Sequence, residues 1–125
     1  MPPRILVADD DPASLSLVGH AMEGLGLSVR CADDGDELLQ ALAEDGPFDL
    51  IVTDVAMPWM TGLQVAQSAR TAGVTTPVIV MTASRVAAED VQHLGDNTVL
   101  LRKPFGLSAL IGAVHQLLPS SHERE

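Results

Sequence analysis

The sequence is poor in cysteine, in aromatic residues and in basic residues, and such shortages exclude whole classes of protein. Its single cysteine, Cys31, cannot form an internal disulfide, which excludes a small secreted domain held together by such bonds. Only 7 lysines and arginines stand against 17 aspartates and glutamates, and the formal net charge of -10 disfavours binding to a nucleic-acid backbone or an anionic membrane surface. No apolar run reaches membrane-spanning length, and the opening MPPR is unlike a secretory signal. We therefore expect a cytoplasmic protein without nucleic-acid or membrane partners.

The residues that are present suit one folded domain. A chain of 125 residues with 46% hydrophobic content is long enough to bury a real core. Cys31 lies in a strand-like stretch, so we interpret it as a structural thiol. The four histidines show no metal-ligand spacing, and we predict that none of them binds a metal: His20, His93, His115 and His122.

Short apolar runs alternate with amphipathic stretches along the chain. The run RILVA is continuously hydrophobic, which is typical of a strand buried on both faces of a parallel sheet. Strands are predicted over residues 4–8, 27–32, 49–53, 77–82 and 98–102. Helices are predicted over residues 12–26, 35–46, 62–73, 85–95 and 106–118, and Gly26 is expected to stop the first of them. This alternation predicts an α/β fold: a doubly wound five-stranded parallel sheet with right-handed crossovers and helices on both faces.

Polar side chains with possible chemical roles stand where four of the five predicted strands end. Ligands of such sheets bind at the carboxyl ends of the strands, near the point where the strand order reverses. At these ends the chain carries Asp9, Asp10 and Asp11, then Asp54, then Thr82 and Ser84, and finally Lys103. Taken singly, Asp54 is more often a loop or capping residue, Thr82 an ordinary hydroxyl and Lys103 a solvated charge. Their joint placement predicts one shared site.

The three consecutive aspartates divide into two roles. Asp11 precedes Pro12, the pairing expected of a helix N-cap followed by proline at the first helical position. Asp9 and Asp10 face Asp54 in this fold, and three clustered carboxylates repel one another unless a cation compensates. Mg²⁺ suits a site of a few carboxylates together with water and a phosphoryl group. The sequence therefore predicts a magnesium site at this edge of the sheet.

Four stretches carry these residues, and they occur in the order ILVADDDP, DLIVTDVAMPWMTGL, PVIVMTAS and LRKPF. In that order and spacing they resemble the motifs of the receiver domain of two-component response regulators. Within that family the chain is similar to single-domain regulators of the chemotaxis Y type. The resemblance implies a flavodoxin-like strand order, 2-1-3-4-5. It also implies a receiver domain over residues 1–119, followed by a polar tail over residues 120–125.

The resemblance implies the acceptor and the metal ligands. By it, Asp54 is the phosphoacceptor, which takes a phosphoryl group from a histidine kinase or a histidine phosphotransfer protein. Asp10 and Asp54 would bind Mg²⁺ directly, together with the backbone carbonyl of Ala56. Asp9 would act on the metal mainly through a water.

The resemblance also implies roles for residues near the fourth and fifth predicted strands. Lys103 would pair with the phosphoryl oxygens, and Thr82 would hydrogen-bond one of them after phosphorylation, as the switch hydroxyl. The metal and the lysine would then neutralise charge on the transferring phosphoryl group, which is how such steps are accelerated. Pro104 would follow a cis peptide bond that orients Lys103, although most bonds before proline are trans.

The chain departs from the family's pattern at the switch. Leu100 stands where the family usually has tyrosine or phenylalanine, so we expect it to pack inward and to couple phosphorylation weakly to the output face. The predicted helix over residues 85–95 is shorter than usual. Ala56 and Ser84 occupy positions that help to set the lifetime of the phosphoryl group in the family. Trp59 is interpreted as a partly packed loop anchor.

The leading hypothesis is a signalling switch that acts on a downstream protein by contact and catalyses only its own phosphorylation and dephosphorylation. Met1 and the polar tail favour a complete chain, although a receiver excised from a hybrid kinase would look the same. A phosphorylation-independent adaptor is a further alternative, because Leu100 alters the switch. An aspartate-nucleophile phosphohydrolase is disfavoured, because Ala56 replaces the second aspartate that such enzymes use. A flavin carrier is disfavoured, because ADDDP would repel a phosphate and the chain has no tyrosine to stack on the cofactor.

Overall fold

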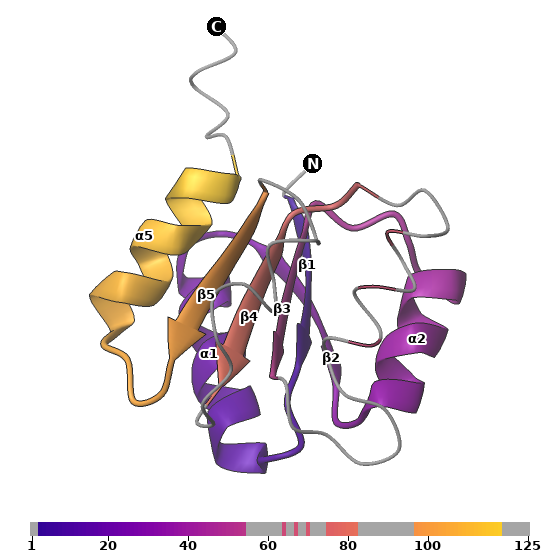
Figure 1. Cartoon of the computed structure of the whole chain (residues 1–125), viewed down its shortest axis with the longest axis horizontal. Helices are drawn as coiled ribbons and strands as arrows, with labels where there is room; N and C mark the ends of the chain where they lie inside the picture. The colour runs from indigo at the N-terminus through magenta and orange to yellow at the C-terminus, as the bar shows by residue number, and fades with distance from the viewer. Residues whose placement is uncertain are drawn as a thin grey trace, which may run out of the picture.

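Five parallel strands form one sheet at the centre of the fold (Figure 1). The computed structural model describes residues 3–54, 64, 67, 70, 75–82 and 97–118. The strands are β1 (Arg4–Ala8), β2 (Ser28–Ala32), β3 (Leu50–Asp54), β4 (Val78–Thr82) and β5 (Thr98–Arg102). Their order in the sheet is β2-β1-β3-β4-β5, and every neighbouring pair is parallel. The predicted fold class and strand order are therefore confirmed.

Three helices in the described part of the chain cover both faces of the sheet. They are α1 (Pro12–Gly24), α2 (Gly35–Glu44) and α5 (Leu107–Leu117). The buried side chains of α1 and α5 pack with one set of strand residues, and those of α2 pack with the other set. Among the residues described, no helix is long and apolar enough to cross a membrane.

Two predicted helices and the polar tail fall largely outside the described residues. Three residues of the predicted helix over 62–73 are described, among them Arg70, and all three are helical. The predicted helix over 85–95 and the tail over 120–125 lie wholly outside the described residues.

Local hydrogen bonds and backbone conformation determine where α1 begins and ends. The carboxylate of Asp11 accepts hydrogen bonds from the backbone N–H of Ala13 at 3.4 Å and from the hydroxyl of Ser14 at 2.9 Å. The predicted N-cap is therefore confirmed. The helix ends at Gly24, earlier than predicted, because the chain then turns and reaches a positive φ of 85° at Gly26.

The core has two layers, one on each face of the sheet. Every residue of β3 and β4 is buried, which accounts for the apolar runs LIV and VIVM with which they begin. Alternate side chains point to opposite faces, so Ile51 and Val80 pack with Leu38 of α2, whereas Val52 packs with Leu110 of α5. Both central strands are thus held by apolar packing on two sides.

Cys31 lies on β2 and is partly buried. Burial raises the pKa of its thiol, and the nearby charge of Glu23 acts in the same direction. The thiol therefore stays protonated near neutral pH, which agrees with the predicted structural role.

Two adjacent leucines of α2 provide a matched test of the core. Leu38 is fully buried, whereas Leu39 is 40% exposed. Because Leu38→Ala leaves a cavity, we expect it to lower the free energy of unfolding by about 2–5 kcal/mol. Leu39→Ala is expected to lower it by less than about 1 kcal/mol. Urea unfolding followed by circular dichroism measures both values, and equal losses would contradict the assignment of Leu38 to the core.

Candidate functional site

The carboxyl ends of the strands meet at one edge of the sheet, because every neighbouring pair of strands is parallel (Figure 1). Asp9 directly follows β1, Asp54 ends β3, Thr82 ends β4 and Lys103 directly follows β5. Because β3 lies between β1 and β4, the residues Asp9, Asp54 and Thr82 stand at the ends of consecutive strands of the sheet. These four predicted site residues therefore share one edge.

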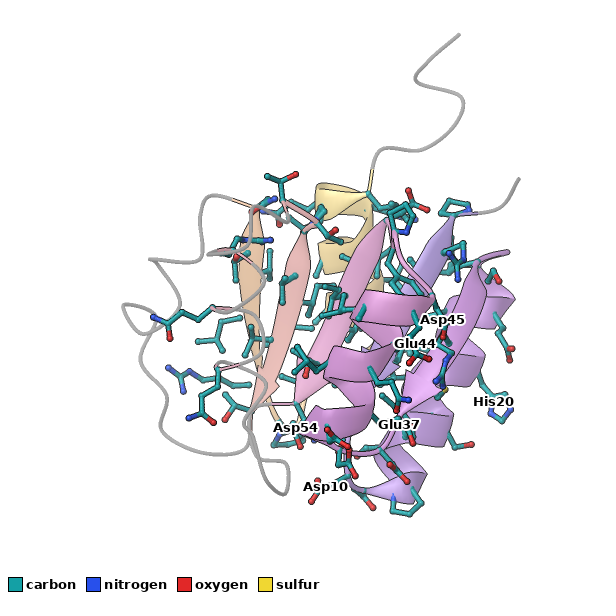
Figure 2. All side chains as sticks on the ribbon, turned by 90° about the vertical axis from the view of Figure 1, so that its right-hand side faces the viewer. Asp10, His20, Glu37, Glu44, Asp45 and Asp54 are labelled. Atoms are coloured by element: carbon teal, nitrogen blue, oxygen red, sulfur yellow. The ribbon has the colours of Figure 1, made fainter. Side chains whose placement is uncertain are left out.

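Three carboxylates converge at this edge. One oxygen from each of Asp9, Asp10 and Asp54 lies within 4.8 Å of the other two. Asp9 is fully buried and Asp54 is 7% exposed, whereas Asp10 is exposed. Figure 2 shows Asp10 and Asp54 at the same end of the sheet. Carboxylate oxygens are the ligands that Mg²⁺ prefers, so this group of residues fits the predicted ion.

Lys103 brings a positive charge to the carboxylates. Its Nζ lies 3.0 Å from Oδ2 of Asp9 and 3.4 Å from Oδ2 of Asp54. Burial alone would lower the pKa of Lys103, but the hydrogen bond to Asp9 and the charge of Asp54 outweigh burial and raise it. The side chain is therefore a permanent cation at neutral pH.

The charge of the buried Asp54 carboxylate is only partly compensated by its surroundings. Burial raises its pKa, and the negative charge of Asp9 raises it further, while Lys103 acts in the opposite direction. The raised pKa means that the ammonium of Lys103 does not fully offset the cost of placing two carboxylates together. A second cation beside Asp54 would lower that cost.

Asp9 makes contacts that the sequence did not indicate. Its Oδ1 accepts a hydrogen bond from the backbone N–H of Asp11 at 3.0 Å, and its Oδ2 accepts one from Lys103 at 3.0 Å. Sequence reasoning assigned Asp9 mainly to the metal and missed its pairing with Lys103. The two residues are 94 positions apart, so no local pattern could have revealed the contact.

The backbone fixes the start of the loop that carries Lys103. Its N–H donates to the carbonyl oxygen of Thr82 at 2.7 Å, which extends the pairing of β4 with β5 by one hydrogen bond. The peptide bond between Lys103 and Pro104 is cis, as predicted. Thr82 is buried at the end of β4, beside the loop.

Of the remaining residues singled out in the sequence, the structure describes Leu100. Leu100 is partly buried and packs against the core layer that contains Leu38, so its predicted inward packing is confirmed. Ala56, Trp59 and Ser84 lie outside the described residues.

Comparison with known proteins identifies the family. A sequence model of the response regulator receiver domain matches residues 5–115. Response regulator MprA of Mycolicibacterium vanbaalenii is 40% identical over 119 residues, which are 94% of this chain and 51% of that protein. Response regulator MprA of Mycobacterium leprae is 38% identical over 116 residues, or 92% of this chain and 50% of that protein. The chain thus spans about half the length of these curated relatives.

Solved structures agree with the sequence comparison. The receiver domain of the Francisella response regulator 1452 has a TM-score of 0.83 and 31% identity, with 92% of this chain and 95% of that chain covered. Response regulator protein TrrA from Thermotoga maritima, solved in complex with Mg(2+)-BeF, has a TM-score of 0.82 and 30% identity, with 94% and 100% covered. The resemblance predicted from the four sequence motifs is confirmed: this chain belongs to the response regulator receiver domain family.

Proposed function

We propose that Asp54 accepts a phosphoryl group from a histidine kinase or a histidine phosphotransfer protein, in a reaction that requires Mg²⁺. The observation that carries this proposal is the position of its carboxylate. It is almost fully buried, it lies 3.4 Å from the Lys103 ammonium, and it is grouped with the carboxylates of Asp9 and Asp10. A nucleophile, a fixed cation and carboxylates that could hold a metal therefore stand together at one edge of the sheet.

The proposed reaction is a transfer from nitrogen to oxygen. A carboxylate oxygen of Asp54 attacks phosphorus, the bond between phosphorus and the donor's imidazole nitrogen breaks, and the electron pair of that bond stays on the nitrogen. Lys103 holds its ammonium against the phosphoryl oxygens and stabilises their charge. Mg²⁺ held by the carboxylates would supply further positive charge against the transferring group.

Each acidic residue has a proposed part in holding the ion. Asp10 and Asp54 would bind it directly, the family resemblance adds the backbone carbonyl of Ala56 as a ligand, and Asp9 would act through a water. The contact between Asp9 and Lys103 adds a second task, because it holds the ammonium next to the acceptor. Family membership and the complex of TrrA with Mg(2+)-BeF support this assignment.

The phosphorylated form is proposed to signal by contact with a downstream protein. Thr82 donates its hydroxyl hydrogen to a phosphoryl oxygen, and Pro104 shapes the loop that carries Lys103. Leu100 lacks an aromatic ring that can change position, so the coupling to the output face is weak. The packing of Leu100 into the core also favours a second candidate function, a phosphorylation-independent adaptor.

The proposal covers a receiver unit over residues 1–119 with a polar tail over 120–125, in the cytoplasm. Its catalysis is limited to its own phosphorylation and dephosphorylation. The relatives are about twice as long as this chain, so their output is not transferred to it. The absence of nucleic-acid binding stays a prediction that rests on the net charge of -10.

Binding of Mg²⁺ should raise the temperature of thermal unfolding, because the ion relieves repulsion among the three carboxylates. At ten times the dissociation constant the expected stabilisation is about 1.4 kcal/mol. We expect Asp10→Ala to reduce the shift and to stabilise the protein without metal. Asp36→Ala, which removes an exposed acid from the first turn of α2, should keep the full shift. Differential scanning fluorimetry with a magnesium titration measures the unfolding temperature of each variant. A rise in Asp10→Ala as large as in the wild type would remove Asp10 from the ligand set.

Asp54→Asn should abolish stable phosphorylation while the protein stays folded, because an amide has a similar shape and is a poor nucleophile. Acetyl phosphate with Mg²⁺ serves as the donor, and intact-protein mass spectrometry detects the acid-labile adduct. Asp45→Asn is the matched control, because this carboxylate lies at the surface and pairs with the exposed Arg30. Labelling of Asp54→Asn at the wild-type level would place the acceptor on another residue.

Amide chemical shifts with and without beryllofluoride test the weak coupling that follows from Leu100. We expect large changes around Asp9, Asp54 and Lys103, and small changes in α5, because a ligand shifts an equilibrium only by its differential affinity for two states. Leu100→Tyr should enlarge the changes in α5. Changes across residues 86–118 as large as those around Asp54 in the wild type would contradict this expectation.

A further inference from the structure

The opposite edge of the sheet, at the amino ends of the strands, carries a second polar cluster. The side-chain amide of Asn97 donates to the carbonyl oxygen of Thr75 at 2.7 Å and accepts a hydrogen bond from Nη2 of Arg70 at 3.1 Å. Nη1 of Arg70 donates to the carbonyl oxygen of Thr76 at 2.7 Å. The backbone carbonyl of Asn97 also accepts a hydrogen bond from the N–H of Val78 at 3.0 Å. Two side chains thus tie together a helical residue, the segment before β4 and the residue before β5.

The chemistry of these contacts makes the cluster rigid. Both oxygen and nitrogen of the Asn97 side-chain amide are used, and the acceptors of Arg70 are amide and carbonyl oxygens. Burial lowers the pKa of the Arg70 guanidinium, which shows that the charge is partly removed from water. Loss of either side chain would remove the hydrogen bond between Nη2 of Arg70 and Oδ1 of Asn97, which links the two.

The cluster lies at one end of the strand whose other end carries Lys103. Pairing of β5 with β4 runs from Val78 opposite Thr98 to Thr82 opposite Arg102, and the N–H of Lys103 adds the last hydrogen bond of this series. A shift by one residue would turn every side chain of β5 to the other face. Lys103 would then leave its positions 3.0 Å from Asp9 and 3.4 Å from the acceptor.

β5 has fewer apolar restraints than the strands in the middle of the sheet. It is the last strand in the order, and its residues are partly or largely exposed, whereas β3 and β4 are buried throughout. Apolar packing therefore determines the register of β5 less strongly, and side-chain hydrogen bonds at its amino end have more influence.

We propose that Asn97, held by Arg70, is a positioning residue that fixes the register of β5 and so sets Lys103 beside the acceptor carboxylate. This inference rests on the proposed role of Lys103 in phosphorylation. By this inference, residues at the amino edge of the sheet position a group that takes part in the reaction at the carboxyl edge.

Amide hydrogen exchange tests the positioning without any phosphorylation. In Asn97→Ala and in Arg70→Gln, exchange at the Lys103 N–H should become about tenfold faster or more, relative to the change at Val52 in β3. Arg30→Gln is the matched control. Arg30 also makes a side-chain hydrogen bond, to Asp45, but it lies on β2, at the other side of the sheet from β5. This variant should leave the ratio unchanged. An unchanged ratio in both Asn97→Ala and Arg70→Gln would overturn the proposal.

A double-mutant cycle tests the effect on the reaction. In the otherwise wild-type protein, Asn97→Ala should slow phosphorylation by acetyl phosphate about three- to tenfold, because the displaced Lys103 ammonium loses its orientation. In a Lys103→Ala background the same substitution should change the rate by less than about twofold. Equal factors in both backgrounds would overturn the positioning role. Failure of the wild type to be labelled would instead contradict the proposed function, and the exchange measurement would still decide the inference.

Discussion

Repulsion among the carboxylates of Asp9, Asp10 and Asp54 is the constraint on which the site depends. Two unit charges about 4.8 Å apart repel by about 3–4 kcal/mol at an effective dielectric constant of about 20. The acids at the strand ends cannot separate, because β1 and β3 are paired up to Ala8 and Thr53, directly before Asp9 and Asp54. One ammonium at 3.0 Å and 3.4 Å offsets part of this repulsion, and the pKa of Asp54 stays raised by burial and by Asp9. The sheet therefore holds an excess of negative charge that favours a bound cation.

Most of the fold could be predicted from local patterns, whereas the strand order could not. Continuous apolar runs such as RILVA predict strands buried on two faces, and both faces of β3 and β4 are indeed buried. The cap at Asp11 was predictable because its partners lie within three residues of it. Strand order depends on contacts between distant segments, so it came from the family resemblance. The stop at Gly26 was also predictable, because glycine takes a positive φ without strain, and the last residue of α1 is Gly24, two residues before it.

The candidate site was predictable as a set of residues but not as a set of contacts. The carboxyl ends of parallel strands share one edge, which places Asp54 and Lys103 together once the strands are recognised. The pairing of Lys103 with Asp9 depends on how far a flexible side chain reaches from β5 toward β1, and the order of the sheet puts β3 and β4 between them. The bond between Arg70 and Asn97 joins residues 27 positions apart through polar side chains that carry no hydrophobic pattern. Such contacts follow from tertiary packing and leave no periodic signal in the sequence.

Different kinds of interaction hold the residues at the two edges of the sheet. At the carboxyl edge, charges of both signs lie within 3.4 Å of one another, so the forces there change whenever a cation or a phosphoryl group binds. At the amino edge, the amide of Asn97 and the guanidinium of Arg70 donate to uncharged oxygens, among them the carbonyl oxygens of Thr75 and Thr76. When the charge around one end of a strand changes, contacts at its other end can keep the strand in register. In the proposed arrangement, Asn97 and Arg70 hold the first end of β5 and Lys103 stands at its last, so that a change of charge at the site would move the Lys103 side chain while the strand stays in place.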